Sequence, residues 1–163
     1  MRAVGNTSPI SNLAVIGHLP LLQSQFSEIW IPPAVLSELD AHPDPVALAA
    51  IRQAIREGWI QTAGHTQSPL LKVLLPHLHR GEAEAIALAS EIGADIVIMD
   101  ERENRQFAVQ AGLSVTGVLG ILLRAKKNGS IPAIEPELQA LRTKARFFIS
   151  PSLEARMLSA AGE

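Results

Sequence analysis

Residues 96–99 (Ile-Val-Ile-Met) constrain the fold of this chain more than any other segment, because all four are apolar and do not alternate with polar residues. A strand of this kind is typical of a parallel sheet whose two faces are both covered by helices. The segment lies between two helical patterns, at residues 82–92 and 101–111. The sequence therefore predicts an α/β fold built from βα units around a central parallel sheet.

The rest of the chain repeats this alternation of short apolar runs and helical patterns. Strands are expected at residues 3–5, 28–31, 59–62, 95–99 and 113–116, which gives a sheet of about five strands. Helices are expected at residues 11–25, 33–40, 45–57, 70–79, 82–92, 101–111, 118–128, 137–146 and 152–160. No repeat or flexible linker interrupts the 163 residues. We therefore expect one domain over residues 1–163, with residues 130–163 as a helical extension packed on it.

The composition excludes several classes of protein. The chain has no cysteine, which rules out disulfides and thiolate metal sites. No apolar run approaches the ~20 residues of a membrane helix and no signal peptide is evident, so we expect a cytoplasmic protein that does not contact the membrane. The first 100 residues hold 5 basic and 10 acidic residues, and the last 63 hold 9 and 6. This asymmetry suits a cation site followed by phosphate contacts, or an ordinary solvated surface.

Four polar residues stand where an α/β fold places its ligands. Asn6 follows the first expected strand and Asp100 the fourth, and ligands bind beyond the carboxyl ends of such strands. Glu38 lies on the helix after the second strand, and Glu82 begins the helix before the fourth. If these side chains converge, their repulsion in a cleft favours a hard divalent cation, Mg²⁺ or Mn²⁺. Such an ion can activate water and stabilise charge on a phosphate, which points to phosphodiester hydrolysis.

Each of these residues also has a purely structural interpretation. Glu82 suits the positive end of a helix dipole, Asp100 can cap the following helix, Asn6 can form an Asx-turn, and Glu38 can be an ordinary solvated residue. Glu84 competes with Glu82 for the same role. Two residues on a helix differ by about 200° of rotation, so both cannot readily face one ion.

Taken in order, these segments resemble the PIN-domain nucleases, and within them the branch called domain of unknown function 3368. The resemblance covers most of the chain and depends on order and spacing rather than on one motif. In the PIN family a polar or acidic residue follows the first strand, and further acids stand in the next helix, at the start of an alanine-rich helix and after the following strand. The matching segments are residues 5–10 (GNTSPI), 33–39 (PAVLSEL), 81–89 (GEAEAIALA), 96–101 (IVIMDE) and 115–120 (VTGVLG).

The resemblance implies a three-layer α/β/α fold with one or two Mg²⁺ or Mn²⁺ ions. It makes Asn6, Glu38, Glu82 and Asp100 the metal ligands, with the three acids as catalytic residues and Glu82 preferred over Glu84. Thr7 or Ser8 would hold a metal-bound water. The implied activity is cleavage of single-stranded RNA, often by the toxin of a toxin–antitoxin pair and often as a homodimer. Most members have aspartate at the position of Asn6, so a catalytically weakened domain that binds RNA or a protein is the alternative.

Basic residues that follow Asp100 in the chain are candidates for nucleic-acid contacts. Arg102 and Arg105 share one helix face, and Arg124, Lys126 and Lys127 lie on the next helix. The chain has no tyrosine and is only 4% aromatic, so phosphate contacts are expected to dominate over base stacking.

Overall fold

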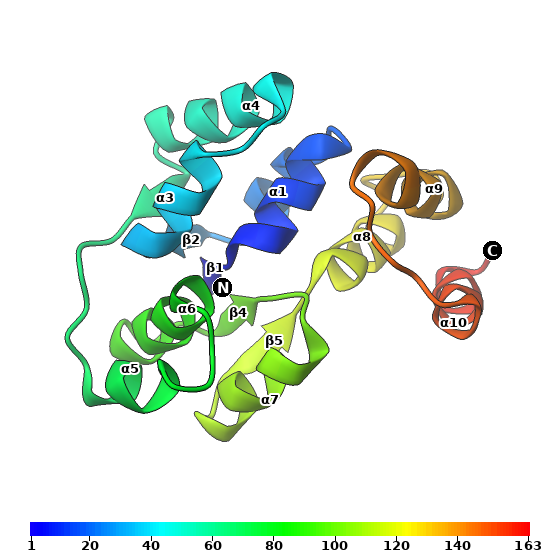
Figure 1. The fold of residues 1–163 in the computed structure, drawn as a ribbon. Helices are drawn as coiled ribbons and strands as arrows, with labels where there is room; N and C mark the ends of the chain where they lie inside the picture. The colour runs from blue at the N-terminus through cyan, green and yellow to red at the C-terminus, as the bar shows by residue number, and fades with distance from the viewer.

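The computed structural model describes all of residues 1–163 and contains a five-stranded, all-parallel sheet in the order β3-β2-β1-β4-β5 (Figure 1). The strands are β1 (Arg2–Gly5), β2 (Glu28–Ile31), β3 (Ile60–Thr62), β4 (Ile96–Ile98) and β5 (Ser114–Thr116). The helices are α1 (Thr7–Val15), α2 (Pro20–Gln25), α3 (Pro33–Asp40), α4 (Pro45–Arg56), α5 (Pro69–Leu74), α6 (Arg80–Glu91), α7 (Arg102–Gln110), α8 (Val118–Lys127), α9 (Glu135–Lys144) and α10 (Pro151–Ala161).

Helices cover both faces of the sheet, as the apolar run at residues 96–99 predicts. Ile98 belongs to the core shared with α1, α3, α4, α8 and α9, whereas Val97 and Met99 belong to the core shared with α5, α6 and α7. Figure 1 shows these two groups of helices on opposite sides of the strands. The expected three-layer α/β/α architecture is confirmed.

The strand order places a topological switch point between β1 and β4. From β1 the chain moves outward through β2 to β3, and then returns to pair β4 with the other side of β1. Gly5 pairs with Ile98, and the Asn6 amide donates a 2.9 Å hydrogen bond to the Ile98 carbonyl oxygen. Since all strands are parallel, the carboxyl ends of β1 and β4 open the crevice in which such folds bind ligands.

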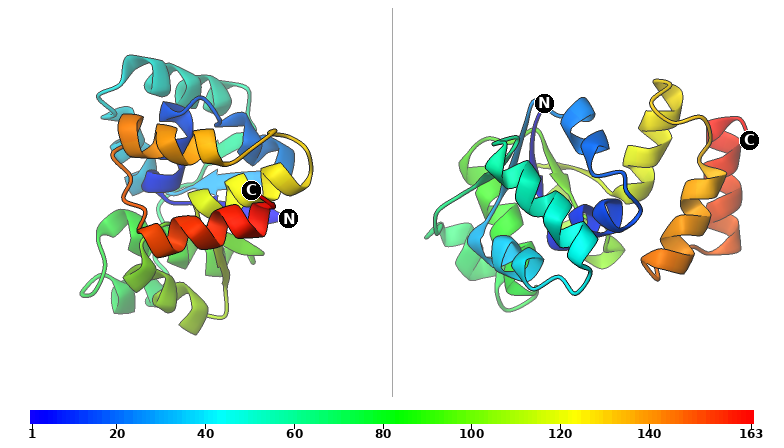
Figure 2. Two further views of the ribbon diagram at one scale, coloured as in Figure 1. Left: turned by 90° about the vertical axis from the view of Figure 1, so that its right-hand side faces the viewer. Right: turned by 90° about the horizontal axis from the view of Figure 1, so that it is seen from above.

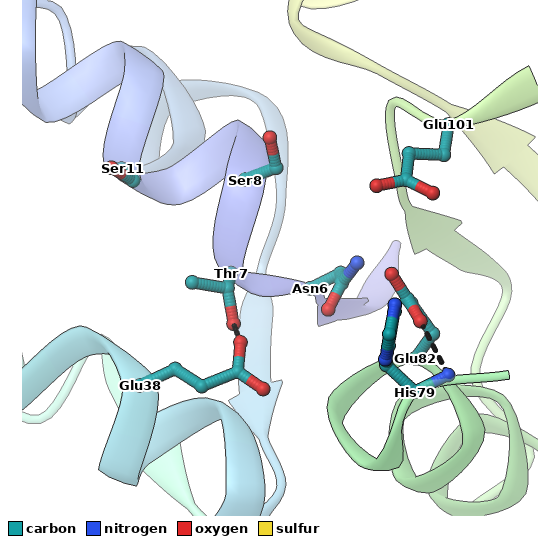
Figure 3. Close-up of a pocket in the computed structure, with 8 residues that line it drawn as sticks. All are labelled: Asn6, Thr7, Ser8, Ser11, Glu38, His79, Glu82 and Glu101. Atoms are coloured by element: carbon teal, nitrogen blue, oxygen red, sulfur yellow. Dashed lines mark hydrogen bonds between the residues drawn. The ribbon is translucent and has the colours of Figure 1, made fainter. Parts of the chain in front are cut away.

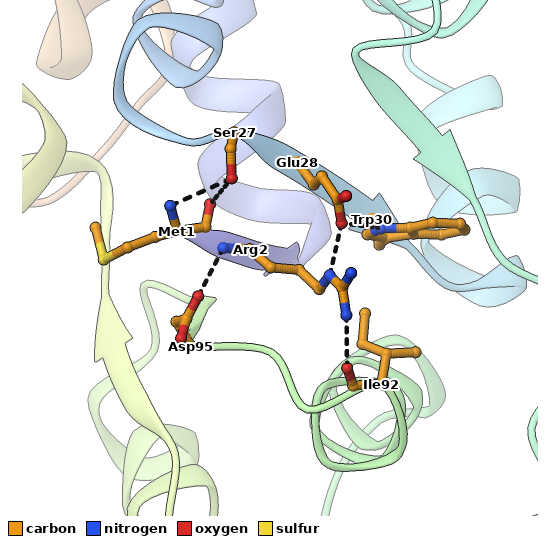
Figure 4. A network of polar contacts seen from close by, with 7 residues as sticks. All are labelled: Met1, Arg2, Ser27, Glu28, Trp30, Ile92 and Asp95. Atoms are coloured by element: carbon orange, nitrogen blue, oxygen red, sulfur yellow. Dashed lines mark hydrogen bonds and ion pairs between the residues drawn. The ribbon is translucent and has the colours of Figure 1, made fainter.

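Polar contacts fasten the opposite, amino-terminal edge of the sheet (Figure 4). The Arg2 guanidinium donates to the Glu28 carboxylate at 2.5 Å and to the Ile92 carbonyl oxygen at 2.9 Å. The Arg2 amide donates to the Asp95 carboxylate at 2.8 Å. These contacts join the starts of β1 and β2 to the turn before β4, and so hold the strands that carry the crevice at their other end.

Two of the expected helices differ from those observed. The helix expected at residues 11–25 is two helices, and it begins earlier, at Thr7. Gly17 adopts a positive φ of 78° and ends the first, and Pro20 starts the second. The helix expected at residues 70–79 ends at Leu74 because Pro76 cannot continue it. No helix of the structure is both long enough and apolar enough to cross a membrane.

Candidate active site

A hollow of about 350 Å³ lies at the carboxyl ends of β1 and β4, and none of its lining side chains is hydrophobic (Figure 3). Its residues come from the start of α1, from α3, from the start of α6 and from the end of β4. They are Asn6, Thr7, Ser8, Ser11, Glu38, His79, Glu82 and Glu101. Three of these residues are glutamates, and no lysine or arginine lines the hollow. The hollow therefore suits a positively charged ligand.

Asn6 is buried, at 5% exposure, and joins β1 to α1. It occupies the N-cap position of α1 but makes no capping hydrogen bond through its side chain. Its backbone instead pairs with Ile98 of β4. The amide group is therefore not used by the helix and points into the hollow (Figure 3), which excludes the Asx-turn interpretation.

Glu38 reaches the hollow from α3. Its carboxylate accepts a hydrogen bond from the Thr7 hydroxyl at the start of α1 (Figure 3). It also lies against the backbone of α6, because a Cβ atom on Gly81 would stand only 2.7 Å from its Oε1. Gly81 thus provides the space that brings Glu38 toward Glu82.

Glu82 lies at the first turn of α6 and is only 7% exposed. Its Oε2 accepts a 2.9 Å hydrogen bond from the His79 amide, so it caps its own helix while its carboxylate faces the hollow. Burial raises the pKa of Glu82 above its ordinary value, and the negative charges of Glu101 and Glu38 raise it further. A cation in the hollow would relieve this repulsion.

Asp100 does not line this hollow. Its Oδ1 accepts a 2.8 Å hydrogen bond from the Val118 amide at the start of α8, an approach that Gly117 permits because a Cβ there would stand 2.5 Å from that oxygen. Its Oδ2 is buried without a hydrogen-bond partner. Burial raises the pKa of Asp100, against the lowering effects of the Val118 amide, of Arg105 and of the nearby Asn12 side chain. The expectation that all four side chains share one crevice is corrected: three line the hollow, and Asp100 borders it from an adjoining groove.

Glu101, rather than Asp100, lines the hollow from the end of β4. Glu101, His79 and Ser11 also line the hollow, and the sequence pattern indicated a role for none of them. Glu101 was the most accessible of these to prediction, since it directly follows Asp100 in the segment that resembles PIN nucleases. Which of two successive residues faces a cavity at a strand end depends on the backbone turn that follows, and the pattern does not specify that turn.

Glu84 points away from the hollow, as the helix rotation predicts. Although it is only 1% exposed, its Oε2 pairs with Arg80 at 2.8 Å and its Oε1 accepts from the Ala34 amide at 3.3 Å. It therefore joins α6 to the first turn of α3. Glu84 is a structural residue, and the acid of α6 that faces the hollow is Glu82.

Replacing Glu84 with alanine is expected to lower the free energy of unfolding by about 1–3 kcal/mol, because the Ala34 amide loses its partner inside the protein. Arg80 is largely exposed and can be solvated, which limits the cost. Urea denaturation measures the change. Glu103→Ala, on the exposed surface of α7, is the matched control and should stay within about 0.5 kcal/mol of wild type. Equal stability of the two variants would contradict the structural role of Glu84.

The five basic candidates separate into two groups. Arg102 and Arg105 line the groove that contains Asp100. Arg124, Lys126 and Lys127 occupy the last turn of α8 and line neither cavity. The Lys126 ammonium donates to the Pro132 carbonyl oxygen at 2.6 Å. Ten residues of helix extend about 15 Å, so these three cations lie well away from the strand ends.

The donor atoms around the hollow suit a hydrated hard cation. No group of three His, Asp or Glu side chains stands close enough to hold an ion by itself. Mg²⁺, however, keeps several waters and is held by only one or two carboxylates. The amide of Asn6 and the carboxylates of Glu38 and Glu82 supply oxygen ligands. Asp100, which directly precedes the lining residue Glu101, has an unpartnered Oδ2. These residues fit such an ion, whose own water molecules would complete its coordination.

Ser11 is not activated as a nucleophile by the histidine beside it. Ser11 Oγ lies 2.7 Å from His42 Nε2, but His42 Nδ1 accepts a hydrogen bond from the Asp44 amide at 3.0 Å. The proton of a neutral imidazole is then on Nε2, which donates to Ser11 and cannot accept its proton. His42 therefore orients Ser11 rather than activating it.

The sheet order, the switch point and the oxygen-rich hollow agree with the family to which the sequence is similar. A family model, DUF3368, described as PIN domain, matches residues 2–163. This chain belongs to the PIN-domain family. PIN domains are generally nucleases and usually use divalent metal ions.

A solved structure agrees with this assignment at the level of the fold. A PilT N-terminus domain protein from the hyperthermophilic archaeon Sulfolobus solfataricus P2 superposes with a TM-score of 0.55 and 20% sequence identity. The match covers 77% of this PIN domain and 93% of that chain. No curated protein matches the sequence.

Proposed function

We propose that this PIN domain is a Mg²⁺- or Mn²⁺-dependent endoribonuclease that hydrolyses phosphodiester bonds in single-stranded RNA. The observation that carries the proposal is the hollow at the switch point. There the buried side chain of Asn6, which makes no capping hydrogen bond, lies with the carboxylates of Glu38 and Glu82. An ion held there would activate water and stabilise the charge that develops on the phosphate.

The residues around such an ion would divide the work. Asn6, Glu38 and Glu82 would hold the ion, with Asp100 as a fourth ligand from the border of the hollow. The hydroxyls of Thr7 and Ser8 lie at the start of α1, where they can hydrogen-bond to a metal-bound water. Thr7 is already bonded to Glu38, so it also fixes the position of that carboxylate.

Cleavage of a single-stranded RNA oligonucleotide with Mn²⁺ tests the proposal, with Asp100→Asn as the first variant. Asparagine retains an oxygen for the Val118 amide but removes the charge, so the fold should persist while cleavage falls more than about 100-fold. Glu103→Gln makes the same chemical change at an exposed position on α7 and should cleave like wild type. Equal activity of wild type and Asp100→Asn would remove Asp100 from the catalytic assignment.

One observation favours a second candidate function, a non-catalytic domain that binds RNA or a protein partner. Asn6 carries no charge where most PIN domains, on the resemblance, have aspartate, and this lowers the expected affinity for a cation. Calorimetric titration of Mn²⁺ into wild type and Asn6→Asp separates the two functions. Binding by wild type together with RNA turnover supports the nuclease, whereas binding only by Asn6→Asp supports the weakened domain.

The wider biological setting stays a prediction. A role as the toxin of a toxin–antitoxin pair, with a small antitoxin protein as partner, would be tested by co-expression with a neighbouring small reading frame. Assembly as a homodimer would be tested by sedimentation.

A further inference from the structure

A second cavity, of about 590 Å³, adjoins the acidic hollow and has the opposite charge. We call it the basic groove. It is lined by the starts of α7 and α8, by β5, and by residues from the C-terminal segment between α9 and the middle of α10. In Figure 1 this orange-to-red segment runs from α9 past α8 to α10. Side chains from residues 147–157 thus supply one wall of a cavity beside the candidate active site.

Three guanidinium groups outnumber the one carboxylate of the groove, that of Asp100, and give the groove its charge. Arg102, Arg105 and Arg156 all line it, and none of them forms a salt bridge. Arg105 is held in place because its Nε donates a 2.9 Å hydrogen bond to the Met99 carbonyl oxygen. Its Nη2 lies against Gly117 at the start of α8, on the wall of the groove. A cluster of guanidinium groups is suited to phosphate oxygens, which such groups bind through two parallel hydrogen bonds.

An exposed aromatic ring lies on the C-terminal wall. Phe148 also lines the groove and is 86% exposed, the largest exposed fraction among the large apolar side chains. Covering an exposed phenyl ring with a flat apolar surface lowers the free energy, because apolar area is removed from water. Nucleic-acid bases present such a surface, and base–aromatic stacking is a general means of binding single strands.

Hydrogen bonds and an ion pair hold the segment that carries Phe148 between α9 and α10. Arg142 of α9 donates to both carboxylate oxygens of Glu154 on α10, at 2.9 and 2.7 Å, and to the Ile149 carbonyl oxygen at 3.3 Å. The side chain of Ile149, next to Phe148, is buried. Both views in Figure 2 show α9 and α10 side by side. These contacts therefore hold the backbone next to Phe148.

The two cavities meet at the end of β4, where Asp100 lines the basic groove and Glu101 lines the acidic hollow. Building on the nuclease function proposed above, we propose that the basic groove binds the single-stranded RNA next to the cleaved bond. Arg102, Arg105 and Arg156 hold the backbone phosphates, and Phe148 stacks on a base. The C-terminal segment is thereby part of the substrate-binding surface.

Binding of a fluorescent single-stranded RNA, measured by anisotropy in EDTA, tests this groove without requiring cleavage. Phe148→Ala is expected to weaken binding about 5- to 150-fold with an unchanged salt dependence. Phe148→Leu should bind as weakly as Phe148→Ala. Although leucine is apolar, it has no aromatic ring to stack on a base. Arg156→Ala should weaken binding and reduce the slope of log K against log salt by about 0.7.

Two matched controls lie on α4, away from both cavities. Arg56→Ala removes an exposed cation and Val46→Ala truncates a side chain that is 75% exposed. Both should bind RNA like wild type. Since Phe148 and Arg156 are exposed, their variants should melt at the wild-type temperature, which separates lost binding from lost folding.

The possible outcomes separate this proposal from the nuclease proposal. Weaker binding of both groove variants without any Mn²⁺-dependent cleavage by wild type supports the groove and rejects the nuclease. Active wild type with unchanged binding by both groove variants rejects the groove alone. Loss of affinity in Lys127→Ala equal to that in Arg156→Ala would indicate diffuse charge attraction, and preferential binding of poly-glutamate would indicate a protein partner; either result overturns the proposal.

Discussion

Replacing Glu82 with glutamine is expected to raise the melting temperature of the metal-free protein at pH 7 while it lowers Mn²⁺-dependent RNA cleavage more than about 100-fold. The pKa of Glu82 is raised by burial and by the charges of Glu101 and Glu38, so its ionised form is less favourable in the folded state than in the unfolded state. Glutamine retains an oxygen for the His79 amide but carries no charge. The same side chain thus costs stability and, in our proposal, binds the ion.

The sign of the pH dependence follows from the raised pKa. Below the unfolded-state pKa of about 4.3 the carboxyl is protonated in both states and carries no penalty. As the pH rises through the folded-state pKa, the penalty reaches its full size. The stabilisation by Glu82→Gln should therefore be present at pH 7 and absent near pH 4.

Thermal denaturation in EDTA and in Mn²⁺ checks both halves of this prediction. A concentration of Mn²⁺ 100 times its Kd should stabilise wild type by about 2.7 kcal/mol, and Glu82→Gln by clearly less. Glu103→Gln, which removes an exposed charge, should melt like wild type in both conditions. A Glu82→Gln protein that melts below wild type in EDTA would show that the charge stabilises the fold, contrary to the burial argument.

Replacing Ile98 with alanine is expected to lower the free energy of unfolding by about 2–5 kcal/mol, the largest stability loss that we predict. Ile98 is fully buried on the face of the sheet that packs against α1 and α8, and the alanine would leave a cavity there. For a chain of this length the melting temperature should fall by roughly 5–15 °C.

Chemical denaturation of a graded series checks this prediction. Ile98→Val should lose only about 0.5–1.5 kcal/mol, because it removes a single methylene. Val73→Ala, at a side chain that is 65% exposed, should stay within about 0.5 kcal/mol of wild type. A loss at Ile98 no larger than that at Val73 would mean that β4 is not central to the core.

Periodicity predicted the elements of this fold well, because burial on one or both faces determines the spacing of apolar residues along a strand or helix. The unbroken apolar run at residues 96–99 indicated a strand covered on both sides, and Val97 and Ile98 do belong to separate cores. Helix rotation likewise separated Glu82 from Glu84. The breaks at Gly17 and Pro76 were harder to predict, since an amphipathic pattern can continue through a residue that ends the helix.

The site was less accessible to prediction, because its residues come from four distant segments. The sequence indicated Asn6, Glu38 and Glu82, and the structure places all three around one hollow. It also indicated Asp100, which instead contacts the start of α8, while Glu101 takes the place beside Glu82. Phe148 carried no signal at all, since an apolar residue near a helix is ordinarily part of the core.

By itself, then, the sequence determined the parallel α/β sheet, the acidic residues at the carboxyl ends of its strands and the likeness to PIN domains. Each of these depends on the spacing and order of residues along the chain. Only the tertiary structure decided which of two successive acids faces which cavity, and that the C-terminal segment forms a wall beside the site. Those outcomes depend on how helices far apart in the chain pack together, and contacts between distant segments leave no periodic trace in the sequence.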